Sequence, residues 1–183
     1  MRKYLCALFG ALLAGCATAP KGVAPVAGFE LGRYLGVWHE IARLDHRFER
    51  GLTDVTAEYS MRPDGGVKVL NRGYDAAAGK WRQAEGRAYF TGPASVGQLK
   101  VSFFRPFYGG YNIVELAPDY SWALVAGPSR KYLWILARGT ELPPGVLERL
   151  KARAAELGFP ADKLIFPGAS APAKGANDAD ASR

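Results

Sequence analysis

The stretch Tyr34-Leu-Gly-Val-Trp-His-Glu-Ile-Ala-Arg-Leu44 places a glycine two residues before a tryptophan, at the start of a β-prone run. A single Gly-x-Trp is a weak signal, because many strands begin with a glycine and carry a tryptophan into a core. Its weight comes from the chain that follows it, up to Arg138, which alternates short strands with turns.

Turn residues divide this part of the chain into hairpin-length units. Pro63-Asp-Gly-Gly66, for example, has glycines where a tight turn needs positive φ. The eight expected strands are 36–44, 53–61, 67–74, 80–91, 98–104, 111–116, 121–126 and 132–138. Short strands at this spacing favour an antiparallel meander, either a sandwich or an up-and-down barrel.

The pattern changes to a helical period after the last strand. Apolar residues recur at helical spacing from Val146 to Leu157, after Leu142-Pro-Pro-Gly145, and Gly158 is a C-terminal stop. One amphipathic helix needs an apolar surface to cover, and the outside of the strand array provides one. Residues 162–166 would add a short ninth strand.

Composition fits a single domain that buries a core and also lines a cavity. The chain has 183 residues, of which 49% are hydrophobic and 12% aromatic. Its formal net charge of +7 falls to +5 without Arg2 and Lys3, and no run of five basic residues occurs. A nucleic-acid partner is therefore not expected, whereas weak attraction to an anionic membrane surface is.

The amino terminus predicts export and lipid attachment. Residues 1–15 combine a basic start with an apolar stretch too short to span a bilayer, which is typical of a signal peptide. Leu13-Ala-Gly-Cys16 resembles the bacterial lipobox, which implies a lipid on Cys16 as the new first residue. The remaining cysteine, Cys6, lies in the leader, so Cys16 has no disulfide partner in the mature chain. Ala17 implies sorting to the outer membrane, on its periplasmic face.

The expected organisation is therefore a leader (1–15), a flexible lipidated tether (16–28), one barrel with its helix (29–168) and a disordered tail (169–183). Three ordered motifs assign the middle part. They are the stretch 34–44 with the loop Asp45-His-Arg-Phe-Glu-Arg-Gly51, then Pro118-Asp-Tyr120 with Ala123-Leu-Val-Ala-Gly-Pro128, and Tyr132-Leu-Trp-Ile-Leu-Ala-Arg138.

These motifs resemble the lipocalin family, and most closely its bacterial outer-membrane lipoproteins and the apolipoprotein D branch. The resemblance implies an all-β fold: an eight-stranded antiparallel up-and-down barrel with one C-terminal helix packed outside. It also implies that the arginine ending the last barrel strand, here Arg138, lies over Trp38. A flat indole can close one end of such a barrel, and a guanidinium over its face adds about 0.5–2 kcal/mol. The expected structural motif is Gly36, Trp38, Asp119, Tyr120 and Arg138.

Alternation along each strand selects the residues that would face the lumen. If Trp38 points inward, so do Glu40 and Ala42. A buried Glu40 would need a partner, such as Arg87 or a tyrosine. The parity of strand 111–116 is left open, since bulges shift it. The candidate lining residues are Ala42, Val55, Ala57, Tyr59, Tyr111, Ile113, Tyr132, Trp134 and Leu136.

An aromatic and aliphatic lumen predicts an apolar ligand with a polar head, either a fatty acid or a lysophospholipid. The loop 45–51 supplies His46, Arg47 and Arg50, which could meet a phosphate or carboxylate at the rim or could simply be solvated charges.

Chemistry-bearing motifs point away from catalysis. Apart from Cys16 the mature chain has no thiol, and His39 and His46 do not form a metal-ligand pattern with other residues. Neither a Gly-x-Ser-x-Gly sequence nor a phosphate-binding glycine loop occurs. We expect no enzyme, no cofactor and no metal site.

Two alternatives stay open. The barrel could be filled by its own side chains and serve as a scaffold that contacts an envelope partner through its loops. The aromatic turn Phe104-Arg-Pro-Phe-Tyr108 could face a partner, the membrane or the barrel mouth, and a homodimer contact near it is one alternative.

Overall fold

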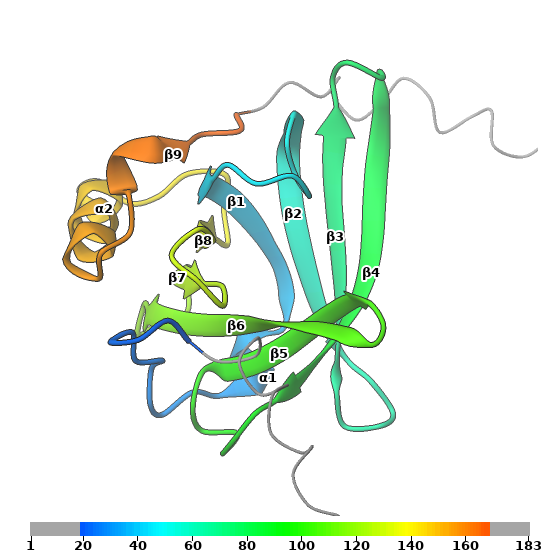
Figure 1. The fold of residues 1–183 in the computed structure, drawn as a ribbon, viewed down its shortest axis with the longest axis vertical. Helices are drawn as coiled ribbons and strands as arrows, with labels where there is room; N and C mark the ends of the chain where they lie inside the picture. Colours follow the sequence, from blue (N-terminus) through cyan, green and yellow to red (C-terminus); the bar gives the residue numbers. More distant parts are fainter. Residues whose placement is uncertain (1–18, 169–183) are drawn as a thin grey trace, which may run out of the picture.

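The computed structural model describes residues 19–168 (Figure 1). The predicted leader, Cys16 and the predicted tail lie outside the described residues. The elements are α1 (Leu31–Tyr34), β1 (Gly36–Leu44), β2 (Leu52–Met61), β3 (Val67–Asp75), β4 (Lys80–Phe90), β5 (Gln98–Phe104), β6 (Phe107–Leu116), β7 (Trp122–Ala126), β8 (Leu133–Ala137), α2 (Val146–Glu156), a 3-10 turn (Ala161–Lys163) and β9 (Leu164–Ile165).

The eight long strands close into an antiparallel barrel. Each strand pairs with the next in sequence, and β1 pairs with both β8 and β2, which joins the two ends of the sheet. This confirms the up-and-down barrel and excludes the sandwich. The short β9 adds to the free part of β1, opposite Arg43 and Leu44. Most strand boundaries differ from the expected ones by one or two residues, and the largest difference is that Phe107–Gly110, expected as a turn, already belongs to β6.

Helix α2 packs against the outside of the barrel, as predicted (Figure 1). Leu150 and Ala154 are fully buried and join an outer apolar cluster with residues of β1, β7 and β8. Gly158 has φ +78, the left-handed conformation that ends a helix. Within residues 19–168, no helix is both long and apolar enough to cross a membrane.

The alternation of the strands divides the core in two. Side chains pointing inward form an inner cluster around Trp38, Tyr34 and Leu136, while those pointing outward form the cluster under α2. β1 changes sides along its length, since a register shift between Glu40 and Ala42 turns the strand over. Ala42 therefore packs under the helix. Arg43 takes the buried inward position that alternation had assigned to Ala42.

The segment before the barrel, from residue 19 onward, packs against the barrel and is not a free tether. Val26 N–H donates to Ile113 O (2.8 Å) and Gly97 N–H donates to Val26 O (2.9 Å). Val23 is buried in the outer cluster, and Ala27 forms a β-bridge with Val96. The expectation of flexibility is wrong for this part, because two apolar valines in a Pro- and Ala-rich stretch reach uncovered surface of β6.

Candidate ligand cavity

One end of the barrel is closed by an indole and a guanidinium. Trp38 is completely buried, and the guanidinium carbon of Arg138 lies 4.1 Å from its ring centre. Arg138 also donates to three backbone carbonyls, those of Arg33 (2.7 Å), Val37 (3.0 Å) and Tyr120 (3.4 Å). The structure thus brings together Trp38 and Arg138, and the side chain of Arg138 ties three chain segments at the closed end.

The other motif residues shape the same end. Gly36 has φ +93, a conformation that favours glycine, and a Cβ there would meet Arg138 Nη1 at 3.4 Å. Glycine therefore permits both this backbone conformation and the close approach of the guanidinium. Asp119 accepts bonds from the backbone and hydroxyl of Ser121, which form a tight turn. Tyr120 accepts a bond from Glu30 N–H (2.9 Å) and lies under the guanidinium of Arg33.

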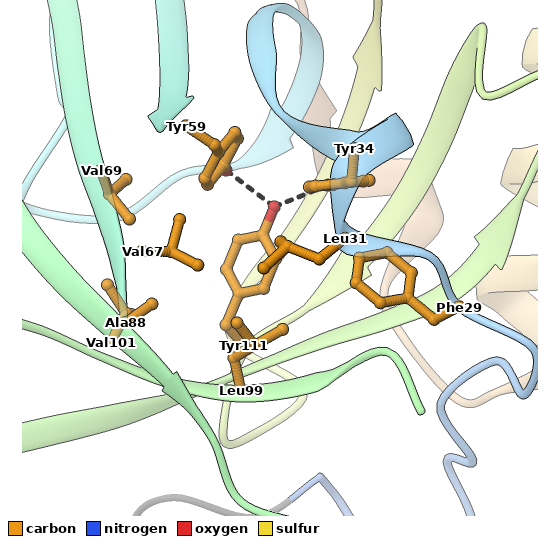
Figure 2. A pocket seen from close by; sticks show the side chains of 10 residues that line it. All are labelled: Phe29, Leu31, Tyr34, Tyr59, Val67, Val69, Ala88, Leu99, Val101 and Tyr111. Atoms are coloured by element: carbon orange, nitrogen blue, oxygen red, sulfur yellow. Dashed lines mark hydrogen bonds between the residues drawn. The ribbon is translucent and has the colours of Figure 1, made fainter. Parts of the chain in front are cut away.

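An apolar inner pocket of about 10 Å³ lies above the closed end (Figure 2). Three tyrosines from α1, β2 and β6 meet there through their hydroxyls. Tyr111 Oη lies 2.7 Å from Tyr34 Oη and 2.7 Å from Tyr59 Oη. Burial raises the pKa of all three phenols, so they stay protonated.

A second cavity, of about 90 Å³, opens toward the mouth. Tyr59, Tyr111, Val69 and Val101 line both spaces, so the tyrosine trio stands between them. Trp134, Leu136, Val125 and Phe103 supply further apolar walls. The polar lining is Glu40, Glu49, Thr56 and Asn71, and the buried Oδ1 of Asn71 has no hydrogen-bond partner among the described residues.

A buried network of charged side chains forms one wall of this cavity. Arg43 Nη1 donates to Glu40 Oε1 (2.5 Å) and Nη2 donates to Glu49 O (2.7 Å). Glu49 Oε2 in turn lies 3.0 Å from His46 Nε2 and accepts a 3.0 Å bond from Trp134 Nε1. The loop 45–51 is thereby fixed to β1 and β8 and closes part of the mouth.

The environment shifts the pKa values of Glu40 and Glu49 in opposite directions. Burial, and then the negative charge of Glu49, raise the pKa of Glu40 to about 8, although Arg43 opposes this. Burial also acts to raise the pKa of Glu49, but the hydrogen bond and charge of His46, with Trp134 and Arg43, bring it below its usual value. Glu40 is thus held by Arg43 and not by Arg87, which was one of its expected partners.

The cavity contains six of the nine candidate lining residues, namely Val55, Ala57, Tyr59, Tyr111, Trp134 and Leu136. Ala42 is wrong because of the β1 bulge. Ile113 is fully buried in the inner cluster but lines neither space, since Val26 and Gly97 pack beside it. Tyr132 also lies outside the lining and stacks on Trp134, with ring centres 6.2 Å apart.

The three rim candidates have different environments. His46 is not a solvated rim charge: it is buried and contacts the rings of Tyr132 and Trp134. Arg50 is exposed and paired with Asp45 (2.7 Å). Arg47 is exposed and lies over the ring of Phe48. Sequence reasoning missed Glu49 as a lining residue and Arg43 as the buried side chain that holds it, because neither an inward arginine nor an inward loop glutamate follows from alternation.

A closed antiparallel barrel with one plugged end and an internal cavity defines a class of small-ligand-binding barrels. Among residues 19–168, no three His, Cys, Asp or Glu side chains gather so as to hold a metal.

Comparison with known proteins gives the family. The model of the lipocalin-like domain matches residues 29–169, so the chain belongs to the lipocalin family. The outer membrane lipoprotein Blc of Vibrio cholerae is 50% identical over 167 residues, which cover 91% of this chain and 98% of that protein. Its counterpart in Escherichia coli K12 is 54% identical over 149 residues (81% and 84%). Temperature-induced lipocalin-1 of Arabidopsis thaliana is 36% identical over 156 residues (80% and 83%).

Solved structures support the fold. Insecticyanin from the tobacco hornworm Manduca sexta superposes with a TM-score of 0.66 at 22% identity, covering 85% of this chain and 88% of that one.

Proposed function

We propose that this protein is a lipid-anchored lipocalin of the bacterial outer membrane, on its periplasmic face, that binds and carries or stores a fatty acid or a lysophospholipid. The observation that carries the proposal is the cavity inside the barrel, lined from β1, β2, β3, β5, β6, β7 and β8, which has mostly apolar walls and a few polar groups. The Blc lipoproteins named above support the location. Maintenance of the membrane under stress is the role that this cargo would serve.

The size of the cavity adds one requirement. Ligand sites commonly measure about 300–1,000 Å³, whereas the two spaces here measure about 90 and 10 Å³. A long acyl chain must therefore displace side chains to enter. Tyr59 and Tyr111 are the residues to move, because they line both spaces and hold each other through one hydroxyl contact and one edge-on ring contact.

Lipid should be recovered from the purified protein by solvent extraction and mass spectrometry, and its titration back should quench tryptophan fluorescence. Trp134→Ala should weaken binding of long acyl chains roughly tenfold or more, because it removes a large apolar wall. Its cost to folding should be about 3–5 kcal/mol at most.

The matched control is Trp81→Ala, which removes an indole from the outer face of the β3–β4 hairpin, where it contacts Tyr74. This variant should bind like the wild type. Absence of any extracted apolar ligand, together with no quenching on titration, would favour the scaffold barrel over the carrier.

Cys16→Ser should release the protein from the membrane fraction and abolish incorporation of labelled palmitate. Several acyl chains on one cysteine hold a protein firmly, since each buried methylene contributes about 0.8 kcal/mol. Cys6→Ser, in the predicted leader, is the matched control and should leave labelling intact. Continued incorporation of palmitate into Cys16→Ser would refute the lipid anchor at this residue.

A further inference from the structure

Four loops surround the open end of the barrel. Trp38 marks the closed end at the start of β1, and the end of β1 pairs with the start of β8, so the β1–β2 and β7–β8 loops share the opposite end. Alternation of an antiparallel barrel adds the β3–β4 and β5–β6 connections. We call this set, residues 45–51, 75–82, 104–107 and 127–132, the mouth loops.

Large apolar side chains protrude from three of the mouth loops, and the most exposed ones lie on two loops at opposite sides of the barrel. Trp81, in residues 75–82, is 47% exposed. Phe104 and Phe107 are 74% and 76% exposed, and Phe48 is 58% exposed. Phe104 and Phe107 are direct partners across the β5–β6 hairpin, so both rings project from one face of its tip. Phe103, beside them, lines the cavity. The hairpin is the tip joining β5 and β6 in Figure 1.

The mouth loops are also basic. They contain seven lysines or arginines against three carboxylates, and Glu49 is buried. The basic residues are Arg47, Arg50, Lys80, Arg82, Arg105, Arg130 and Lys131, and the acidic ones are Asp45, Glu49 and Asp75. Arg105 lies between the two exposed phenylalanines, and Arg47 lies over Phe48. Aromatic rings next to arginine suit the interface of a bilayer, where rings enter the headgroup layer and guanidinium groups pair with phosphates.

The amino-terminal segment begins beside the same end. Arg130, in the β7–β8 loop, donates from Nη2 to Lys21 O (2.8 Å) and from Nε to Leu157 O (2.8 Å). Four residues lie between Cys16 and Lys21, and the five Cα-to-Cα steps span at most about 18 Å of extended chain. A lipid on Cys16, which rests on the proposed function, would therefore keep the mouth loops close to the membrane.

We propose that the open end of the barrel docks on an anionic lipid surface, with Phe48, Phe104 and Phe107 entering the headgroup layer and the neighbouring arginines contacting lipid phosphates. A second copy of the chain fits this surface less well than an anionic membrane, because two open ends facing each other would bring their basic loops together. Docking brings the cavity opening against the layer that holds the proposed cargo. Cargo could then enter without crossing water.

The test uses the full chain with a tryptophan at the hairpin tip, Phe107→Trp, mixed with vesicles of phosphatidylcholine and phosphatidylglycerol in equal parts. Met61→Trp is the matched control, because Met61 is also exposed (54%) but ends β2 at the closed end. Any amino-terminal anchor is common to both variants, so their difference reports the hairpin alone. The native tryptophans, including Trp81 in the mouth loops, give both variants the same background emission. Above that background, the emission of Phe107→Trp should shift further to the blue and be quenched more strongly by brominated acyl chains than that of Met61→Trp.

Charge should contribute to this docking. Adding Arg105→Gln to the Phe107→Trp chain should lower the ratio of docked to undocked protein, read from the quenching, roughly fivefold. High salt should act in the same direction. Equal quenching by vesicles of phosphatidylcholine alone would contradict the anionic part of the proposal.

Two results would overturn the proposal. One is equal quenching of Phe107→Trp and Met61→Trp by brominated vesicles. The other is a blue shift that grows with protein concentration in the absence of vesicles, since a second copy would then cover the hairpin. Neither depends on whether lipid is recovered from the cavity or on whether Cys16 is acylated, so the proposed function is tested separately.

Discussion

Arg43→Met should lower the free energy of unfolding by about 3–5 kcal/mol above pH 8, where Glu40 is ionised, as expected when one partner of a buried ion pair is removed. Arg43 is 1% exposed, and its guanidinium bonds Glu40 and the backbone of the mouth loop at Glu49. The variant leaves Glu40 buried without its cation and frees the loop 45–51 from β1. Urea unfolding followed by circular dichroism measures the loss.

The loss should depend on pH in a definite direction. The folded pKa of Glu40, about 8, is raised above its unfolded value. A carboxyl group of this kind stabilises the fold while it is protonated, and its contribution is lost as pH rises through the folded pKa. Without Arg43 the folded pKa rises further, so the difference between variant and wild type should widen as pH rises through about 8.

Glu40→Gln provides the control for this prediction. It removes the titrating group, so unfolding of the double variant Arg43→Met, Glu40→Gln should show no widening with pH and should regain part of the lost stability. A single variant with an unchanged unfolding curve at both pH 6 and pH 9 would contradict the role given to this pair.

Arg138→Ala should cost about 2–4 kcal/mol of stability and leave ligand affinity nearly unchanged. The variant loses the cation–π contact with Trp38 and three hydrogen bonds from a cation to backbone carbonyls, discounted because the guanidinium is partly exposed. The cavity residues lie beyond the tyrosine trio, away from this end. Thermal unfolding and ligand titration on the same sample separate the two effects.

Arg138→Lys tests the geometry, since an ammonium group keeps the charge but lacks the planar fork that reaches three carbonyls. It should fall between the wild type and Arg138→Ala. An unaltered melting temperature in Arg138→Ala with loss of binding would move Arg138 from the plug to the ligand site.

Strand count, strand order and the helix outside the barrel could be predicted from the sequence, because short-range alternation and turn residues encode them. The approach of Arg138 to Trp38 is anticipated only through the resemblance to the lipocalin family, since alternation and turn residues do not indicate it. Alternation also places Val55, Ala57 and Tyr59 correctly in the lumen. These are properties of regular strands, for which one inward residue determines the others.

The rest depends on irregular backbone and on contacts distant in sequence. The bulge after Glu40 exchanges Ala42 for Arg43, and no residue in that stretch is a glycine or proline that would signal it. The loop 45–51 reads as polar and exposed, yet His46 and Glu49 turn inward because Trp134 and Arg43 offer partners from β8 and β1. The docking of Val23 and Val26 similarly depends on the surface of β6, which their own sequence does not contain.

The tyrosine trio has a consequence for how the cavity presents itself to an incoming group. Three phenolic hydroxyls carry three protons, and the two short contacts through Tyr111 use only two of them. The third proton can reside on Tyr34, Tyr111 or Tyr59 depending on the direction of donation, with no heavy atom displaced. Tyr59 borders both spaces. The floor of the cavity can therefore offer a hydrogen-bond donor to one ligand and an acceptor to another, by rotation of hydroxyl groups alone.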